Sequence, residues 1–133
     1  MNPDIAALVV HGYDRFNAGE RVPQLAFWHE DGEYHASAED PDSAVHRGIE
    51  AVRAQFATWL DAYPDLRVEP LEARANGDVV FAWVRFSGHG AGSGVPMEME
   101  LAHVWTMRDG RAERVVEYSD RDDGLAAAGL SPE

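Results

Sequence analysis

Apolar and polar residues alternate along residues 95–118, and this period of two predicts two β-strands. Asp109 and Gly110 separate the two runs. Such a pair is a strong hairpin signal, because glycine tolerates the positive φ of a tight turn. A single titratable group in the apolar row of the first strand is either a hydrogen-bonded core residue or part of a pocket. The row consists of Met97, Met99, Leu101, His103, Trp105 and Met107.

Apolar residues with helical spacing predict four helices in the rest of the chain. Asn2 or Asp4 can cap the first helix, and Asp120 can cap the last one. Pro64 stops the third helix, because proline cannot continue the helical hydrogen-bond pattern. The predicted helices cover about residues 5–17, 22–29, 49–63 and 121–128.

Strand patterns fill most of the remaining chain. Residues 79–87 are apolar on both faces, which is typical of a central strand. Asp31-Gly32 is predicted to form a turn, and residues 38–47 and 88–94 are predicted to be loops. Two further strands are expected over about residues 33–37 and 66–75.

This order of elements predicts one α+β domain over residues 1–133. We expect a curled antiparallel sheet that forms a cone, with the N-terminal helices packed across its concave face. The interior of such a cone is the expected ligand site. The outer face of the sheet, with Ala102, Val104 and Val115 among charged residues, is expected to pair two copies in a homodimer.

Charge and composition exclude several kinds of function. The net charge of −13 repels phosphate backbones and anionic membranes, so we expect neither nucleic acid nor a membrane as a partner. The chain has no cysteine, and its 11 basic residues are all arginine, which excludes thiolate and lysine chemistry. No signal peptide or membrane-length apolar run is present, so a soluble cytoplasmic protein is expected. No metal or other cofactor is expected, because no metal-binding spacing connects His29, His35, His46 and His89.

Six short motifs, spread over nearly the whole chain, carry a family resemblance. They are NAGE (17–20), DGEYH (31–35), RGIEAV (47–52), AHVWT (102–106), RDGR (108–111) and EYSDR (117–121). Together they resemble the nuclear transport factor 2-like superfamily, and specifically its SnoaL-like polyketide cyclase branch. The resemblance implies a cystatin-like cone. It leaves the activity open, because this superfamily hosts several kinds of enzyme as well as binding proteins.

SnoaL-like cyclases pair a histidine on the penultimate strand with an acid on the last strand, and His103 and Glu117 are similar in placement. The resemblance therefore implies a cofactor-independent cyclase, isomerase or lyase that uses acid–base chemistry on a small apolar carbonyl compound. A non-catalytic small-molecule-binding domain is the alternative. A limonene epoxide hydrolase-like enzyme is the third, although only Arg85 suits the middle of the relay that it needs. A ketosteroid isomerase is disfavoured, because Gly12 and Ala36 stand at the positions of its catalytic tyrosine and aspartate.

The acidic partner of His103 depends on the register of the hairpin. An imidazole has an ordinary pKa of about 6.5 and can both donate and accept, which suits proton transfer near neutrality. With a two-residue turn, plain alternation puts Glu117 on the opposite face and Tyr118 and Asp120 on the same face. A single β-bulge between Ala112 and Glu117 would reverse this. Asp120 also has a structural explanation as a helix cap.

A set of aromatic residues is expected to line the pocket, around a flat, fused-ring ligand. For each of them an ordinary core position is the alternative. Arg85 either binds a carboxylate or enolate of the substrate or pairs with surface glutamates. The expected substrate-binding residues are Tyr13, Tyr34, Phe56, Trp59, Trp83, Arg85, Trp105 and Tyr118.

Overall fold

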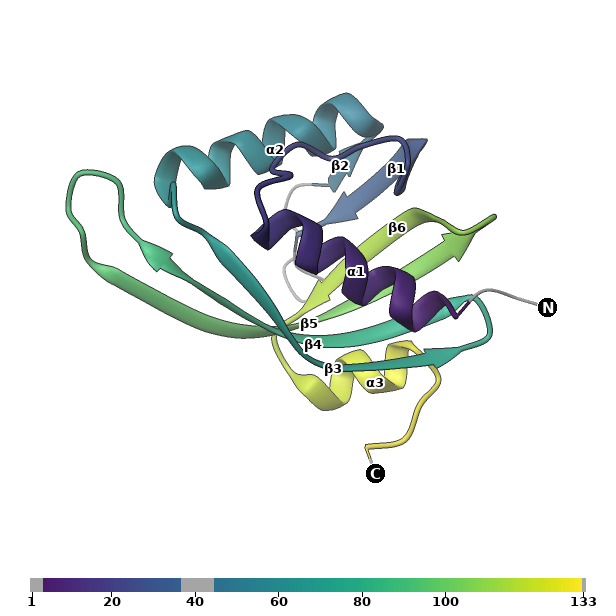
Figure 1. Cartoon of the computed structure of the whole chain (residues 1–133). Coiled ribbons are helices and arrows are strands. Elements are labelled where there is room, and N and C mark those ends of the chain that lie inside the picture. Colours follow the sequence, from purple (N-terminus) through teal and green to yellow (C-terminus); the bar gives the residue numbers. More distant parts are fainter. Residues whose placement is uncertain (1–3, 37–44, 133) are drawn as a thin grey trace.

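Two helices lie on the concave side of a curled six-stranded sheet, and a third helix lies on the opposite side (Figure 1). This computed structural model describes residues 4–36 and 45–132. In chain order the elements are α1 (Ile5–Asn17), β1 (Trp28–His35), β2 (Val45–Arg47), α2 (Ile49–Ala62), β3 (Arg67–Asn76), β4 (Val79–His89), β5 (Pro96–Arg108), β6 (Arg111–Tyr118) and α3 (Arg121–Ala127). The strand order in the sheet is β2-β1-β6-β5-β4-β3. The α+β cone is therefore confirmed.

Three of the predicted helices are confirmed, and local signals explain their ends. The side chain of Asp4 caps α1 by accepting a hydrogen bond from the backbone N–H of Ala7 at 3.2 Å. Asp120 caps α3 in the same way, by accepting from two N–H groups of the first turn. Helix α2 ends just before Pro64, as proline requires.

The predicted helix over residues 22–29 is wrong. The chain makes a single turn there, in which the N–H groups of Phe27 and Trp28 both donate to the carbonyl oxygen of Gln24. Strand β1 then begins at Trp28. The Trp28 side chain is only 3% exposed, whereas Leu25, which shares the helical spacing, is 45% exposed. Burial of Trp28 in the core beside the sheet therefore overrides the local helical pattern.

Strand β1 is longer than predicted, because Asp31-Gly32 lies inside it and does not form a turn. The register between β1 and β6 shifts after Trp28, as at a β-bulge. A Cβ atom at Gly32 would lie 2.9 Å from the Trp28 ring and 3.0 Å from the carbonyl oxygen of His29. Only glycine fits this close approach, which explains why a turn-like pair occurs within a strand.

The sheet is mixed and not purely antiparallel as expected, because β1 pairs with β6 in parallel. All other neighbouring strands are antiparallel. Strand β2 occupies the last part of the predicted loop over residues 38–47, and residues 37–44 lie outside the described residues. Strand β4 continues to His89, two residues further than predicted.

Helix α3 covers the part of the outer sheet face where a second copy was expected. Gly124 of α3 packs so closely that a Cβ atom there would lie 2.5 Å from the Cβ atom of Ala102. Ala102 and Val104 are buried with this helix, and Val115 belongs to the core on the concave side. The expected dimer surface is therefore wrong in these residues, and homodimer formation itself stays a prediction.

The larger core lies on the concave side, between the sheet and helices α1 and α2. Val9, Tyr13 and Phe16 of α1 face this core, at the spacing that the sequence predicted. Within residues 4–36 and 45–132, no helix has the length and hydropathy needed to cross a membrane.

Candidate functional site

A β-bulge in the hairpin determines which side chains face the concave core. Asp109 and Gly110 form the two-residue turn, and both have positive φ. Between Thr106 and Met107 the register with β6 shifts by one residue, so that Glu113 is the extra residue of the bulge. His103 then lies directly opposite Glu117.

Directly opposed residues of an antiparallel pair point to the same face of the sheet. The bulged alternative of the sequence analysis is therefore confirmed, and the plain alternation is wrong. The extra residue rotates the later part of β6 so that Glu117 shares the concave face with His103. Strand β4 continues this row with Ala82, which lies opposite His103 on its other side.

His103 and Glu117 form a buried pair. The imidazole Nε2 lies 2.9 Å from Oε2 of Glu117, and the two residues are 3% and 7% exposed. The hydroxyl group of Tyr34 donates to the same oxygen at 2.5 Å. A carboxylate only accepts hydrogen bonds, so Nε2 must carry a hydrogen when Glu117 is ionised. Glu117 thereby fixes the tautomer of the imidazole ring.

The second nitrogen of His103 is also occupied. Nδ1 lies 2.7 Å from the hydroxyl oxygen of Tyr13, and the indole N–H of Trp105 donates to that same oxygen at 2.8 Å. With Nε2 protonated, Nδ1 of a neutral imidazole is an acceptor, so the Tyr13 hydroxyl donates to it. Tyr13, His103 and Glu117 therefore form a continuous hydrogen-bonded chain.

Burial keeps the two tyrosines of this network in the phenol form. The pKa of Tyr13 is raised well above its ordinary value, mainly because the ring is removed from water, and the charge of Glu117 adds to the effect. The Trp105 hydrogen bond opposes this shift without cancelling it. The pKa of Tyr34 is raised for the same reasons, burial first and Glu117 second. Both hydroxyl groups therefore remain proton donors at neutral pH.

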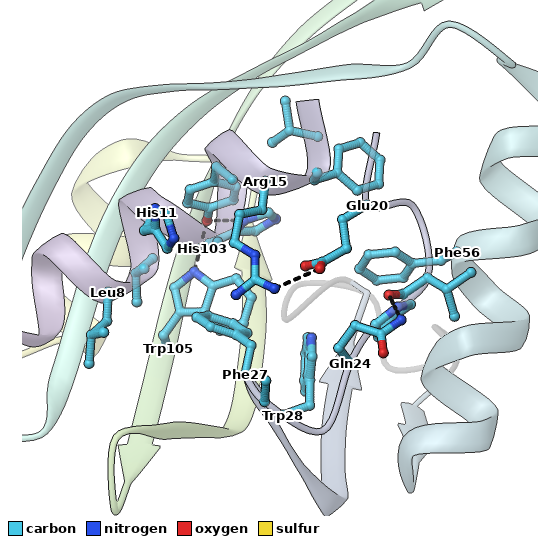
Figure 2. Close-up of a pocket in the computed structure, with 18 of the residues that line it drawn as sticks. Leu8, His11, Arg15, Glu20, Gln24, Phe27, Trp28, Phe56, His103 and Trp105 are labelled. Carbon is cyan, nitrogen blue, oxygen red and sulfur yellow. Dashed lines mark hydrogen bonds and ion pairs between the residues drawn. The ribbon is translucent and has the colours of Figure 1, made fainter. Parts of the chain in front are cut away.

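A cavity of about 150 Å³ opens beside this network. Its lining includes fully buried side chains such as Tyr13 and His103 as well as exposed ones such as Gln24, so the cavity extends from the surface into the core. Among the lining residues, Arg15 and Glu20 point toward one another and form an ion pair (Figure 2). Glu117 lies behind His103 and is not part of the lining.

Seven of the residues that the sequence analysis selected come together at this site. Six of them line the cavity, and the seventh, Glu117, contacts His103 from the side away from the cavity. The aromatic walls pack edge to face, with 5.1 Å between the ring centres of Tyr34 and Trp59. The lining residues that were predicted are Tyr13, Tyr34, Phe56, Trp59, His103 and Trp105.

Four selected residues lie elsewhere, and the strand register explains three of these cases. Tyr118 lies opposite Ala102, on the outer face, where it packs near α3. Trp83 is on the same outer face, and its indole N–H donates to Glu100 at 2.9 Å. Asp120 is exposed and serves as the cap of α3. The predictions of pocket roles for Trp83, Tyr118 and Asp120 are therefore not met.

Arg85 also lies on the outer face, between two glutamates. Its guanidinium group is 3.6 Å from Glu98 and 3.8 Å from Glu100. Ala82 and Val84 place the concave face of β4 at even-numbered positions, so Arg85 points away from His103. Arg85 therefore has the surface role that the sequence left open, and it does not supply the middle member of an epoxide hydrolase relay.

Several lining residues were not recognised from the sequence. Phe27 and Trp28 were assigned to a helix that does not exist, so their place in the pocket was not visible. Phe86 lies at an even-numbered position of β4, and the alternation from Ala82 onward could have revealed it. Arg15 of α1 follows Tyr13 by only two residues, and no pattern indicated that both border one cavity.

Among residues 4–36 and 45–132, no group of three or more histidine, aspartate or glutamate side chains is arranged to hold a metal ion.

The chain belongs to the SnoaL-like domain family, whose model matches residues 9–115. Among solved structures it resembles IdmH, a candidate polyketide cyclase from Streptomyces antibioticus, at 21% identity and a TM-score of 0.75 over 96% of this chain and 100% of that one. A candidate SnoaL-like polyketide cyclase from Jannaschia sp. CCS1 gives 19% identity and a TM-score of 0.71 over 99% of both chains.

A third similar structure is a hypothetical protein with a ketosteroid isomerase-like fold from Catenulispora acidiphila, in complex with trimethylamine. It has 21% identity and a TM-score of 0.70, over 98% of this chain and 95% of that one. No curated protein sequence matches the chain. These neighbours, all at 19–21% identity, show that the chain shares their fold.

Proposed function

We propose that this protein is a cofactor-independent enzyme of the cyclase, isomerase or lyase type, which moves a proton on a small apolar carbonyl compound. The observation that carries this proposal is the hydrogen-bonded chain from Tyr13 through His103 to Glu117 beside an apolar cavity. Such a chain places a proton acceptor and a proton donor at one end of the site, as reactions α to a carbonyl group require.

Tyr13 is the group that touches the substrate. Both nitrogens of His103 are engaged, so a proton reaches Nδ1 through the Tyr13 hydroxyl. As the substrate gives up the proton α to its carbonyl group, the phenol oxygen receives it and the phenol proton passes to Nδ1. The electron pair of the broken C–H bond stays on the substrate as an enolate. Return of a proton to another atom of the substrate completes an isomerisation or ring closure.

Glu117 and Tyr34 are positioning residues. When His103 takes up a proton it becomes an imidazolium ion, and the carboxylate 2.9 Å away stabilises this charge. The hydroxyl of Tyr34 holds the same carboxylate oxygen in place. Because the pair is nearly inaccessible to water, its electrostatic interaction is stronger than at a surface.

Deuterium exchange at an α-carbon tests the proposal without knowledge of the natural substrate. Acetophenone is incubated with the protein in D₂O, and loss of the methyl proton signal is followed by NMR. We expect exchange faster than in buffer, and a decrease of ~10²–10⁴-fold in His103→Ala. Trp83→Phe, on the outer face, is the matched control and should exchange like the unmodified protein. Bound acetophenone that exchanges only at the buffer rate would contradict the proposal.

A non-catalytic binding domain is the second candidate, and one observation favours it. Both ring nitrogens of His103 already have partners within the protein, as in a purely structural histidine. In that case His103→Ala changes ligand affinity or stability, and there is no exchange activity to lose.

A further inference from the structure

We infer that the pocket selects a neutral compound with a single ring, whose carbonyl oxygen lies at the Tyr13 hydroxyl. The size and the neutrality of the ligand depend on the cavity alone. The position of the carbonyl group rests on the proposed function.

Size follows from the cavity volume. An apolar cavity of similar volume in another protein takes up benzene, so about 150 Å³ accommodates roughly six to ten non-hydrogen atoms. This volume is too small for the fused-ring ligand that the aromatic lining led us to expect. A second fused ring would have to displace wall residues or remain outside the cavity, toward the surface.

The walls resist such a displacement, because their aromatic rings pack against one another. On one side Phe56 and Trp59 have ring centres 5.3 Å apart, and each contacts Tyr34 edge to face. On the other side the ring of Trp105 lies 5.5 Å from that of Phe27 and 5.4 Å from that of Trp28. Closely packed interiors change volume only at a cost in stability. The same rings offer flat faces and edges to a planar ligand.

Neutrality follows from the charges around the cavity. Within the described residues, the formally charged side chains in the lining are Arg15 and Glu20, and they form an ion pair of 2.6 Å with each other. An anionic ligand would either compete with Glu20 for Arg15 or lie among apolar walls near the buried carboxylate of Glu117, and both are unfavourable. A cationic ligand would compete with Arg15 for Glu20. The net charge of −13 adds repulsion for anions approaching the protein.

The polar end of the ligand is determined by one hydroxyl group. Once His103 carries a proton on both nitrogens, Nδ1 donates to the Tyr13 oxygen, which also accepts from Trp105. This state follows the proton transfer from the α-carbon, and in it the hydrogen of the Tyr13 hydroxyl is directed to a third acceptor. The enolate oxygen formed from the carbonyl group of the substrate is in a position to accept it. A ring compound with one carbonyl group therefore matches both the walls and this donor.

Three ligands separate size from charge in a binding experiment, with dissociation constants measured by NMR titration of the ¹⁵N-labelled protein. Acetophenone is neutral with one ring, 2-acetylnaphthalene is neutral with two fused rings, and benzoate matches acetophenone in its number of non-hydrogen atoms but is an anion. We expect acetophenone to bind at least about tenfold more tightly than either of the others. Burial of the larger apolar area would favour 2-acetylnaphthalene if the walls yielded. Equal or tighter binding of 2-acetylnaphthalene or benzoate would overturn the inference.

Phe56→Ala is the variant that enlarges the cavity, and Trp83→Phe on the outer face is its control. We expect Phe56→Ala to bind 2-acetylnaphthalene more tightly than the unmodified protein does, and the control to keep the original order. Unchanged affinity in folded Phe56→Ala would contradict the assigned wall. The ligand series on the unmodified protein decides the inference even if this variant fails to fold. Binding of acetophenone without α-exchange would disprove the proposed function and leave the size and charge selection intact.

Discussion

His103 and Glu117 lie directly opposite one another on neighbouring strands, with Nε2 and Oε2 2.9 Å apart. The pair exists because one extra residue, Glu113, bulges from β6 and turns Glu117 to the concave face. Its burial places a negative charge behind the imidazole ring and leaves the other ring nitrogen to Tyr13. This arrangement determines which group donates in each hydrogen bond, from Tyr13 to His103 and from His103 to Glu117.

The tautomer of His103 is the first prediction. Because Glu117 accepts from Nε2 and Tyr13 donates to Nδ1, we expect the hydrogen of the neutral imidazole to lie on Nε2. The ¹⁵N chemical shifts of the ring measure this directly, since protonated and unprotonated nitrogens resonate far apart. Tyr118→Phe, on the outer face, should leave the shifts unchanged. A hydrogen on Nδ1 in the neutral ring would reverse the assigned direction.

Stability at alkaline pH is the second prediction. The folded-state pKa values of Tyr13 and Tyr34 are raised above the ordinary tyrosine value of about 10. The folded protein therefore binds more protons than the unfolded chain above that pH. The stabilisation is fully present below about pH 10 and is lost as the pH rises toward the folded-state values.

Absorbance at 295 nm, followed together with circular dichroism, checks this expectation. Of the four tyrosines, two should ionise only as the protein unfolds. Tyr13→Phe and Tyr34→Phe should each remove one tyrosine from that late step. Ionisation of all four tyrosines in the folded protein near pH 10 would show that the two rings are accessible to water.

The third prediction concerns the outer face. Gly124→Ala should destabilise the protein by about 1–3 kcal/mol, because the new Cβ atom would lie 2.5 Å from Ala102 and force α3 away from the sheet. The gain in helix propensity of up to about 1 kcal/mol opposes this effect but does not cancel it. Urea denaturation gives the change in the free energy of unfolding. Ala126→Ser, exposed on the same helix, is the control, and a stabilised Gly124→Ala would refute the close packing.

Much of the fold could be predicted from the sequence, because its signals are local. The cap at Asp4, the stop at Pro64 and the turn at Asp109-Gly110 each depend on one or two residues, and all three occur as expected. His103 was identified for the same reason, since a titratable residue in an apolar row is visible in the sequence alone.

The missing part of the site depends on interactions between distant segments. A bulge needs only one extra residue, and Glu113 looks like any polar residue of a strand, so the sequence could name the bulge as an alternative but not place it. The same applies to Trp28, whose partners on β6 come from the other end of the chain. Trp83 and Tyr118 were misplaced, and the role of Arg85 stayed open, because the orientation of β4 and β6 relative to the cone was not known.

Tyr13→Phe tests the central claim most directly, because it keeps the aromatic ring and the pair of His103 with Glu117 but removes the hydroxyl group that connects them to the cavity. The measurement is the rate of deuterium uptake by bound acetophenone in D₂O, with the dissociation constant determined alongside. For the bound ligand, we predict a rate at least ~10²-fold below that of the unmodified protein. An undiminished exchange rate in Tyr13→Phe would contradict the account, because the proton would then reach His103 without the Tyr13 hydroxyl.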